Sequence, residues 1–158
     1  MRLLEFASLI RPLRGDGPLT RDVNGVAWAA NGGPQGTDPL SCRRESGFLI
    51  CQGWDNSSSQ YRSILFAVTD RIGTYALGGN GAFSFPLAEL AMLSKSNTNP
   101  AVQMIWGSEP VGGSGTVTIT TLTATGGSGT FSFIAVGRTE TGATGTQVIR
   151  GGVFDITF

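Results

Sequence analysis

The segment "GGSGTVTITTLTATGGSGTFSF" (residues 112–133) contains the string GGSGT twice, at a spacing of 14 residues. A Gly/Ser string by itself is compatible with a flexible linker or with the turns of a sheet. After the first string, Val117 and Ile119 alternate with threonine, and after the second, Phe131 and Phe133 alternate with serine and threonine. Alternation with a period of two is typical of a strand with one buried face. The sequence therefore predicts that both GGSG strings are turns between strands.

The alternation continues to the last residue of the chain. In "IRGGVFDITF" (149–158), Phe154, Ile156 and Phe158 share one parity, and the residues between them share the other. We therefore expect residues 116–158 to form a three-stranded antiparallel meander, whose last strand places Phe158 in the core.

One residue breaks the pattern within the meander. Leu122 falls out of parity with Val117 and Ile119. A β-bulge inserts one extra residue into a strand and moves the following side chains to the opposite face. The mismatch predicts a bulge or a change of facing near Thr120–Thr121.

Shorter β signals lie upstream of the meander. Asn24–Gly25 stands between two valines, the arrangement of a two-residue hairpin turn. The segment "YRSILFAVTD" (61–70) is apolar on both parities, so we expect both of its faces to be covered. With 24 glycines to form bends, the chain is predicted to be all-β. The expected fold is an antiparallel β-sandwich or barrel with Gly-rich hairpins and at most one or two short helices.

One interior segment has the pattern of a helix. In "PLAELAMLSKS" (86–96), Pro86 suits the first helical position and the apolar residues form a loose stripe. A chain of 158 residues most simply makes one domain, which we place at 21–158, preceded by an N-terminal arm at 1–20. The arm is expected to pack on the protein's own core or on a neighbouring subunit through its apolar residues Leu3, Leu4, Phe6, Leu9 and Ile10.

The two cysteines lie in one predicted hairpin. If Ser46–Gly47 is a two-residue turn, counting outward pairs Cys42 with Cys51 at a non-hydrogen-bonded position, where side chains approach most closely. That separation suits a cross-strand disulfide, and two free thiols are the alternative. A disulfide would indicate an oxidising compartment. Two thiols without histidine do not predict a zinc site.

Composition excludes several classes of function. Eleven basic and eleven acidic residues balance, and Arg43–Arg44 is the only adjacent basic pair, so nucleic-acid binding is not expected. The sequence has no run of 18 apolar residues, so no membrane-spanning helix is predicted. It has no histidine, and its carboxylates are scattered without an obvious pair. We therefore predict a protein that is not an enzyme and that binds no cofactor or metal ion.

Three neighbouring residues are the candidates for a surface binding site. Trp54, followed by Asp55 and Asn56, resembles an exposed aromatic beside polar groups, as in sites that stack sugars. Trp28 and Trp106 lie in alternating apolar segments and are expected in the core.

Several motifs together resemble a known family. "VNGVAW" near the start, "GTYALGG" in the middle and "SGTVTITTLTATGGSGTFSFIAV…GGVFDITF" at the end are similar to an uncharacterised bacterial domain family. That family is found largely in secreted or lipid-anchored envelope proteins of Gram-negative bacteria, and the likeness covers about residues 23–158. It implies an extracellular or cell-surface location and no established activity. The helix-like segment at 86–96 and the absence of a lipobox-like cysteine near the start depart from the family and argue against lipid anchoring.

These patterns favour a non-enzymatic structural or binding module of the extracellular or cell-envelope type that acts through protein–protein contacts. One alternative is a subunit of an ordered assembly, a virion decoration protein or an extracellular filament, in which the N-terminal arm contacts a neighbour. Another is a carbohydrate-binding module that uses Trp54. The expected partners are protein, including further copies of the chain, or glycan.

Overall fold

The computed structural model describes residues 22–36, 39–78, 85–95 and 103–158. The predicted arm, with Leu3, Leu4, Phe6, Leu9 and Ile10, lies outside these residues. Within them, no helix has the length and apolar character needed to cross a membrane. The elements are β1 (Asp22–Val23), β2 (Val26–Ala27), β3 (Leu40–Glu45), β4 (Phe48–Asp55), β5 (Gln60–Thr69), β6 (Gly73–Leu77), β7 (Leu87–Ser94), β8 (Met104–Gly107), β9 (Ser114–Leu122), β10 (Gly126–Gly137) and β11 (Thr146–Thr157), with 3-10 helices η1 (Pro34–Gly36) and η2 (Thr139–Thr141).

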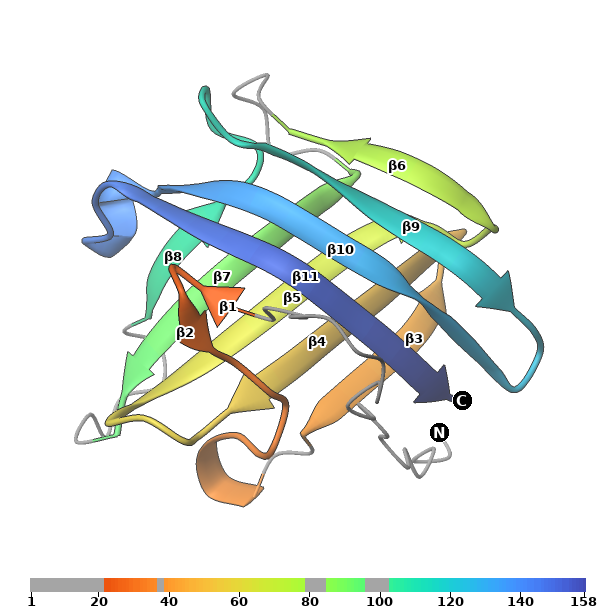
Figure 1. The fold of residues 1–158 in the computed structure, drawn as a ribbon, viewed down its shortest axis with the longest axis horizontal. Helices are drawn as coiled ribbons and strands as arrows, with labels where there is room; N and C mark the ends of the chain where they lie inside the picture. The colour runs from red at the N-terminus through yellow and green to blue at the C-terminus, as the bar shows by residue number, and fades with distance from the viewer. Residues whose placement is uncertain (1–21, 37–38, 79–84, 96–102) are drawn as a thin grey trace.

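The fold is all-β and antiparallel, as predicted, and its sheet curls into a half-barrel (Figure 1). The strands follow the order β2-β1-β11-β10-β8-β7-β5-β4-β3, with β9 paired to β10 and β6 paired to β9. Strand β10 pairs with β9 along most of its length and with β8 at Val136 and Gly137. This long strand therefore joins the two halves of the curled sheet, because it belongs to both ladders.

The core lies between the two halves. In Figure 1 the ribbons of β9, β10 and β11 lie in front of those of β4, β5 and β7. The ring of Phe66 on β5 lies 5.7 Å from the ring of Phe131 on β10 and 5.0 Å from that of Phe154 on β11, measured between centroids. Trp28 and Trp106 are buried in the same cluster, as predicted.

The C-terminal meander is confirmed. Strands β9, β10 and β11 pair in sequence order, and the predicted inward residues of all three are buried. Phe158 is partly buried against the core. The bulge is confirmed as well: Ser128 pairs with Thr121 while Gly129 pairs with Ile119, so Thr120 is the extra residue.

The two predicted hairpins are also confirmed. Asn24–Gly25 joins β1 to β2, and Ser46–Gly47 joins β3 to β4, with positive φ at all four residues. Positive φ at both central positions is the geometry of a type I′ turn, which matches the twist of the flanking strands. The register that follows places Cys42 opposite Cys51.

The prediction that both GGSG strings are turns is wrong in part. Gly112 lies in a turn, but Ser114 and Gly115 lie in β9, and the whole second string, 126–129, lies in β10. The turn between the strands is at 123–125, closed by the Thr123 amide donating to the Gly126 carbonyl. A Cβ at Gly129 would lie 2.0 Å from the Thr118 carbonyl oxygen and 2.6 Å from the Phe154 ring. Glycine is required there by close approach rather than by a bend.

The predicted helix at 86–96 is wrong. Residues 87–94 form β7, between β5 and β8. Ala88 and Leu90 pack in the core, whereas Leu87 and Leu93 are buried on the opposite face. A central strand that is covered on both faces carries an almost continuous apolar run, which periodicity cannot separate from the stripe of a helix.

Candidate functional site

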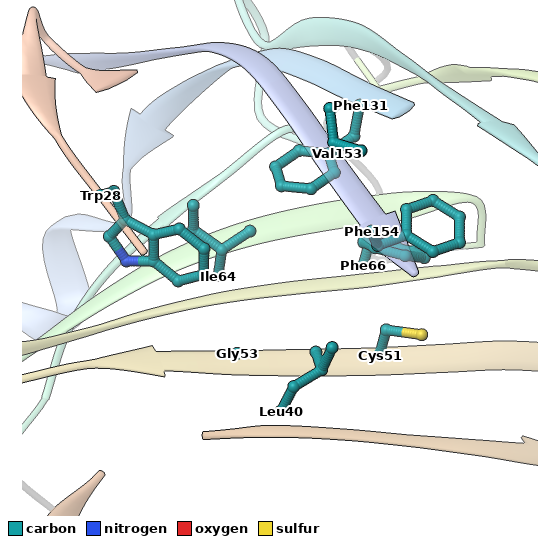
Figure 2. A pocket seen from close by; sticks show the side chains of 9 residues that line it. All are labelled: Trp28, Leu40, Cys51, Gly53, Ile64, Phe66, Phe131, Val153 and Phe154. Atoms are coloured by element: carbon teal, nitrogen blue, oxygen red, sulfur yellow. The ribbon is translucent and has the colours of Figure 1, made fainter. Parts of the chain in front are cut away.

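The interior of the half-barrel is filled by side chains. Figure 2 shows Trp28, Ile64, Phe66, Phe131 and Phe154 converging around a cavity of about 20 Å³. A neighbouring cavity measures about 10 Å³. Cavities of this size hold at most a water molecule. The features that offer contacts to other molecules therefore lie on the outer faces of the described strands.

The outer face of β9, β10 and β11 is mostly polar, although Ile134, Val148 and Val153 also point outward and Ile134 is 38% exposed. Along these strands the outward positions alternate with the buried apolar ones, and they are exposed or half-buried. We call this surface the polar face; it comprises Thr116, Thr118, Ser128, Thr130, Ser132 and Asp155.

The outer face of β4, β5, β7 and β8 is mostly apolar, with Gln52, Ser63 and Glu89 as polar members. The ladders place its residues in rows across the sheet, for example Trp54, Ser63, Ala91 and Ile105. Leu87 is 1% exposed and Leu93 is 4% exposed, and Trp54, Ala67 and Ala91 are buried as well. Phe48, Ile50, Leu65 and Ile105 are half-buried. We call this surface the apolar face; it comprises Phe48, Ile50, Trp54, Leu65, Ala67, Leu87, Ala91, Leu93 and Ile105.

Three charged residues meet at the β8 edge of the apolar face. Arg138, directly after β10, donates from Nη2 to Oε1 of Glu89 on β7 and to Oε1 of Glu109, which follows β8. The side chains of Arg138, Glu89 and Glu109 are 15%, 17% and 6% exposed. We call these three residues the charge cluster.

Gly107 makes room for the cluster. It lies opposite Glu89 in the β7–β8 ladder, and a Cβ there would lie 2.3 Å from Oε2 of Glu109. Oε2 of Glu109 is enclosed and has no hydrogen-bond partner among the described residues. A carboxylate oxygen that is buried without a donor is unfavourable, because it has lost its hydration.

The electrostatics of the cluster follow from burial. Burial raises the pKa of Glu89 above its ordinary value; the charge and hydrogen bond of Arg138 oppose that rise, and the nearby Glu109 adds to it. General acid–base chemistry requires a carboxyl group within reach of a substrate. Both carboxylates here are mostly buried and share one guanidinium, so the charge cluster links β7 to the segments that follow β8 and β10.

A hollow of about 420 Å³ opens beside the charge cluster. We call it the acidic hollow. Glu109 and Arg138 form part of its wall, and Glu140, Pro110 and Val111 complete much of it.

The predicted surface trio is corrected by the structure. Trp54 belongs to the apolar face and is 9% exposed, Asp55 is fully buried, and Asn56 is exposed. Trp54 is buried in its row with Ser63 on β5, and the next residue, Asp55, lies opposite Arg62. The expected exposed aromatic residue is therefore absent at this position. Asn56 instead accepts at its carbonyl from Lys95.

Asp55 forms a buried ion pair with Arg62 on β5. Burial by itself raises the pKa of Asp55, but hydrogen bonds from Ser57 and Arg62, together with the Arg62 charge, outweigh this and hold the pKa below its ordinary value. Arg62 also donates to the carbonyl of Ala27 and so ties β2 to β5. This pair has a structural role that sequence reasoning missed.

The predicted pairing of Cys42 with Cys51 is confirmed at disulfide distance. Their Cα atoms lie 4.1 Å apart and both side chains are buried on the inner face.

No protein family, curated protein or solved structure matches this chain. The resemblance to the envelope domain family stays a prediction.

The charge cluster was not anticipated, because its members are far apart in the sequence. Residues 89, 109 and 138 meet only once β7, β8 and β10 are adjacent. One signal was present: Glu89 is the sole charged residue in the apolar run "PLAELAML". A charged residue within such a run seldom stays buried unless it is paired.

Proposed function

We propose that this protein is a non-catalytic structural or binding module that acts through protein–protein contacts, in an extracellular or cell-envelope setting. The observation that supports this proposal is the apolar face. Phe48, Ile50, Leu65 and Ile105 are half-buried on one side of the sheet, among side chains that are buried, and Phe85, which packs on Phe48 with ring centroids 4.6 Å apart, is 45% exposed. Partly exposed apolar side chains gathered on one face are typical of contact sites on folded proteins.

Two further features support the proposed extracellular setting and indicate which partner to test. The Cys42–Cys51 pair suits an oxidising compartment. An apolar sheet face is also suited to a second copy of itself, since two such faces pack about 10 Å apart with interdigitated side chains. We therefore take self-association as the contact to test first, with an ordered assembly as its larger form.

The test is the molar mass of the full chain in solution over a range of concentrations. We expect the wild type to associate and Leu65→Lys to remain monomeric, because a charge on the apolar face would be desolvated in the contact. Thr130→Lys, on the polar face, is the matched control and should behave as the wild type. A wild type that is monomeric throughout, or equal behaviour of the two variants, would contradict contact through this face.

A further inference from the structure

Among the residues that the structure describes, the charge cluster has two acidic groups and one basic group. Two carboxylates, Glu89 and Glu109, share the single guanidinium of Arg138. Glu140 contributes another carboxylate to the wall of the acidic hollow. Charges that are partly withdrawn from water are screened less than those on an open surface. The acidic hollow therefore attracts a positively charged group.

The cluster also lacks one hydrogen-bond donor. Arg138 satisfies Oε1 of Glu109, while Oε2 is enclosed without a partner among the described residues. Glu109 is one of the residues that line the acidic hollow, so a group bound there lies beside this carboxylate. An N–H donor in the hollow would supply the missing hydrogen bond.

The unpartnered oxygen and the lining of the hollow indicate which kind of cation the hollow would bind. One unpartnered oxygen needs one donor, whereas a divalent ion such as calcium takes six to eight oxygen ligands. Pro110 and Val111 give the hollow an apolar wall, and Val111 is 78% exposed. An alkyl chain can lie on such a wall while its charged head reaches the acidic end, as lysine side chains do elsewhere.

We propose that the acidic hollow binds an alkylammonium group, with Glu109 and Glu140 facing the ammonium and Pro110 and Val111 contacting the alkyl chain. This inference is independent of the contact through the apolar face. Two sources have the required chemistry: the lysine side chain of a protein, and a free alkylamine.

The experiment is an NMR titration of the isotope-labelled full chain. The probes are the peptide acetyl-Gly-Lys-Gly-amide and n-butylammonium, and the neutral controls are the same peptide with norleucine or with Nε-acetyl-lysine. We expect saturable shifts of the amides of residues 109–111 and 137–140 with both charged probes, weaker binding as salt is raised, and no saturation with the neutral peptides. Tighter binding of the peptide would identify a protein lysine as the source, and tighter binding of n-butylammonium a free amine.

Two variants localise the effect. Glu109→Gln should weaken binding about tenfold, because it removes the charge opposite the ammonium. Glu45→Gln is the matched control; Glu45 pairs with Arg43 on the distant β3, and its loss should leave binding unchanged. No saturable shift with either charged probe, equal binding of a neutral peptide, or equal binding by Glu109→Gln would overturn the proposal. If Glu109→Gln does not fold, the test is the binding of the lysine peptide and of the Nε-acetyl-lysine peptide to the wild type. Equal binding of the two peptides would overturn the proposal.

Discussion

The polar face and the apolar face belong to the same curled sheet, yet they treat their outward side chains in opposite ways. On β10, Thr130 and Ser132 are exposed and alternate with the buried Phe131 and Phe133. On β7, Leu87 and Leu93 are as well buried as the inward Leu90. One half of the sheet is therefore an ordinary boundary between core and water, whereas the other half is apolar on both sides.

This difference between the two faces indicates which surface is the better candidate for binding a partner. A strand whose outward side chains are polar needs no partner on that face, because water forms hydrogen bonds with those side chains. On the apolar face Leu87 and Leu93 are already buried, whereas the half-buried Ile50, Leu65 and Ile105 and the exposed Phe85 would lose further contact with water against a partner, which is favourable. For this reason the apolar face, rather than the threonine-rich one, is the surface that we propose for contacts.

The largest change is expected beneath the apolar face, at the Asp55–Arg62 pair. Asp55→Asn would leave the buried Arg62 without its counter-charge and should lower the free energy of unfolding by about 3–5 kcal/mol. Since the folded pKa of Asp55 lies below its ordinary value of 3.8, the wild-type contribution is present above that pH and is lost as pH falls through the folded pKa. Urea denaturation at several pH values measures both effects. An acid loss of stability that is equally steep in the variant would show that the pair does not contribute it.

The comparison itself is tested by truncating one outward residue on each face. Leu87→Ala should cost about 2–4 kcal/mol of unfolding free energy, as a buried core truncation does. Thr130→Ala, on the exposed polar face, should cost less than about 1 kcal/mol. Urea denaturation of the two variants gives both values. Similar costs at the two positions would remove the distinction between the faces.

The smallest effect on the free energy of unfolding is expected from Glu89, which is buried at the edge of the apolar face. Its pKa is raised in the folded state, so the folded protein binds this proton more tightly than the unfolded chain does. The resulting stabilisation is fully present below the ordinary value of 4.5 and is lost as pH rises through the higher folded pKa. Glu89→Gln should flatten the stability profile over that interval. A variant profile that keeps the wild-type slope there would contradict this assignment.

Local features were predictable where they depend on near neighbours in the sequence. The Cys42–Cys51 register followed from a two-residue turn and simple counting. The bulge at Thr120 followed from the parity of Leu122. Both depend on side chains alternating with a period of two, which few residues suffice to reveal.

Prediction failed where two faces are covered or where contacts are distant. The run at 86–96 indicates burial but not the kind of element, so β7 was predicted as a helix. Trp54 was expected on the surface because polar residues follow it, yet it lies in a row with Ala91 and Ile105 from β7 and β8. Glycines of the second GGSG string were predicted to bend the chain, whereas Gly129 lies in β10, where the Thr118 carbonyl and the Phe154 ring leave no room for a side chain.

The sequence by itself determined the strand pattern of the meander, the hairpin turns and the pairing of the cysteines, because each depends on dihedral preferences and alternation among near neighbours. Only the tertiary structure decided which strands lie side by side, which faces lose contact with water, and that Glu89, Glu109 and Arg138 meet. Those outcomes depend on long-range strand pairing through β10. The residues that pair are dozens of positions apart, so no short stretch of sequence predicts which strands become neighbours.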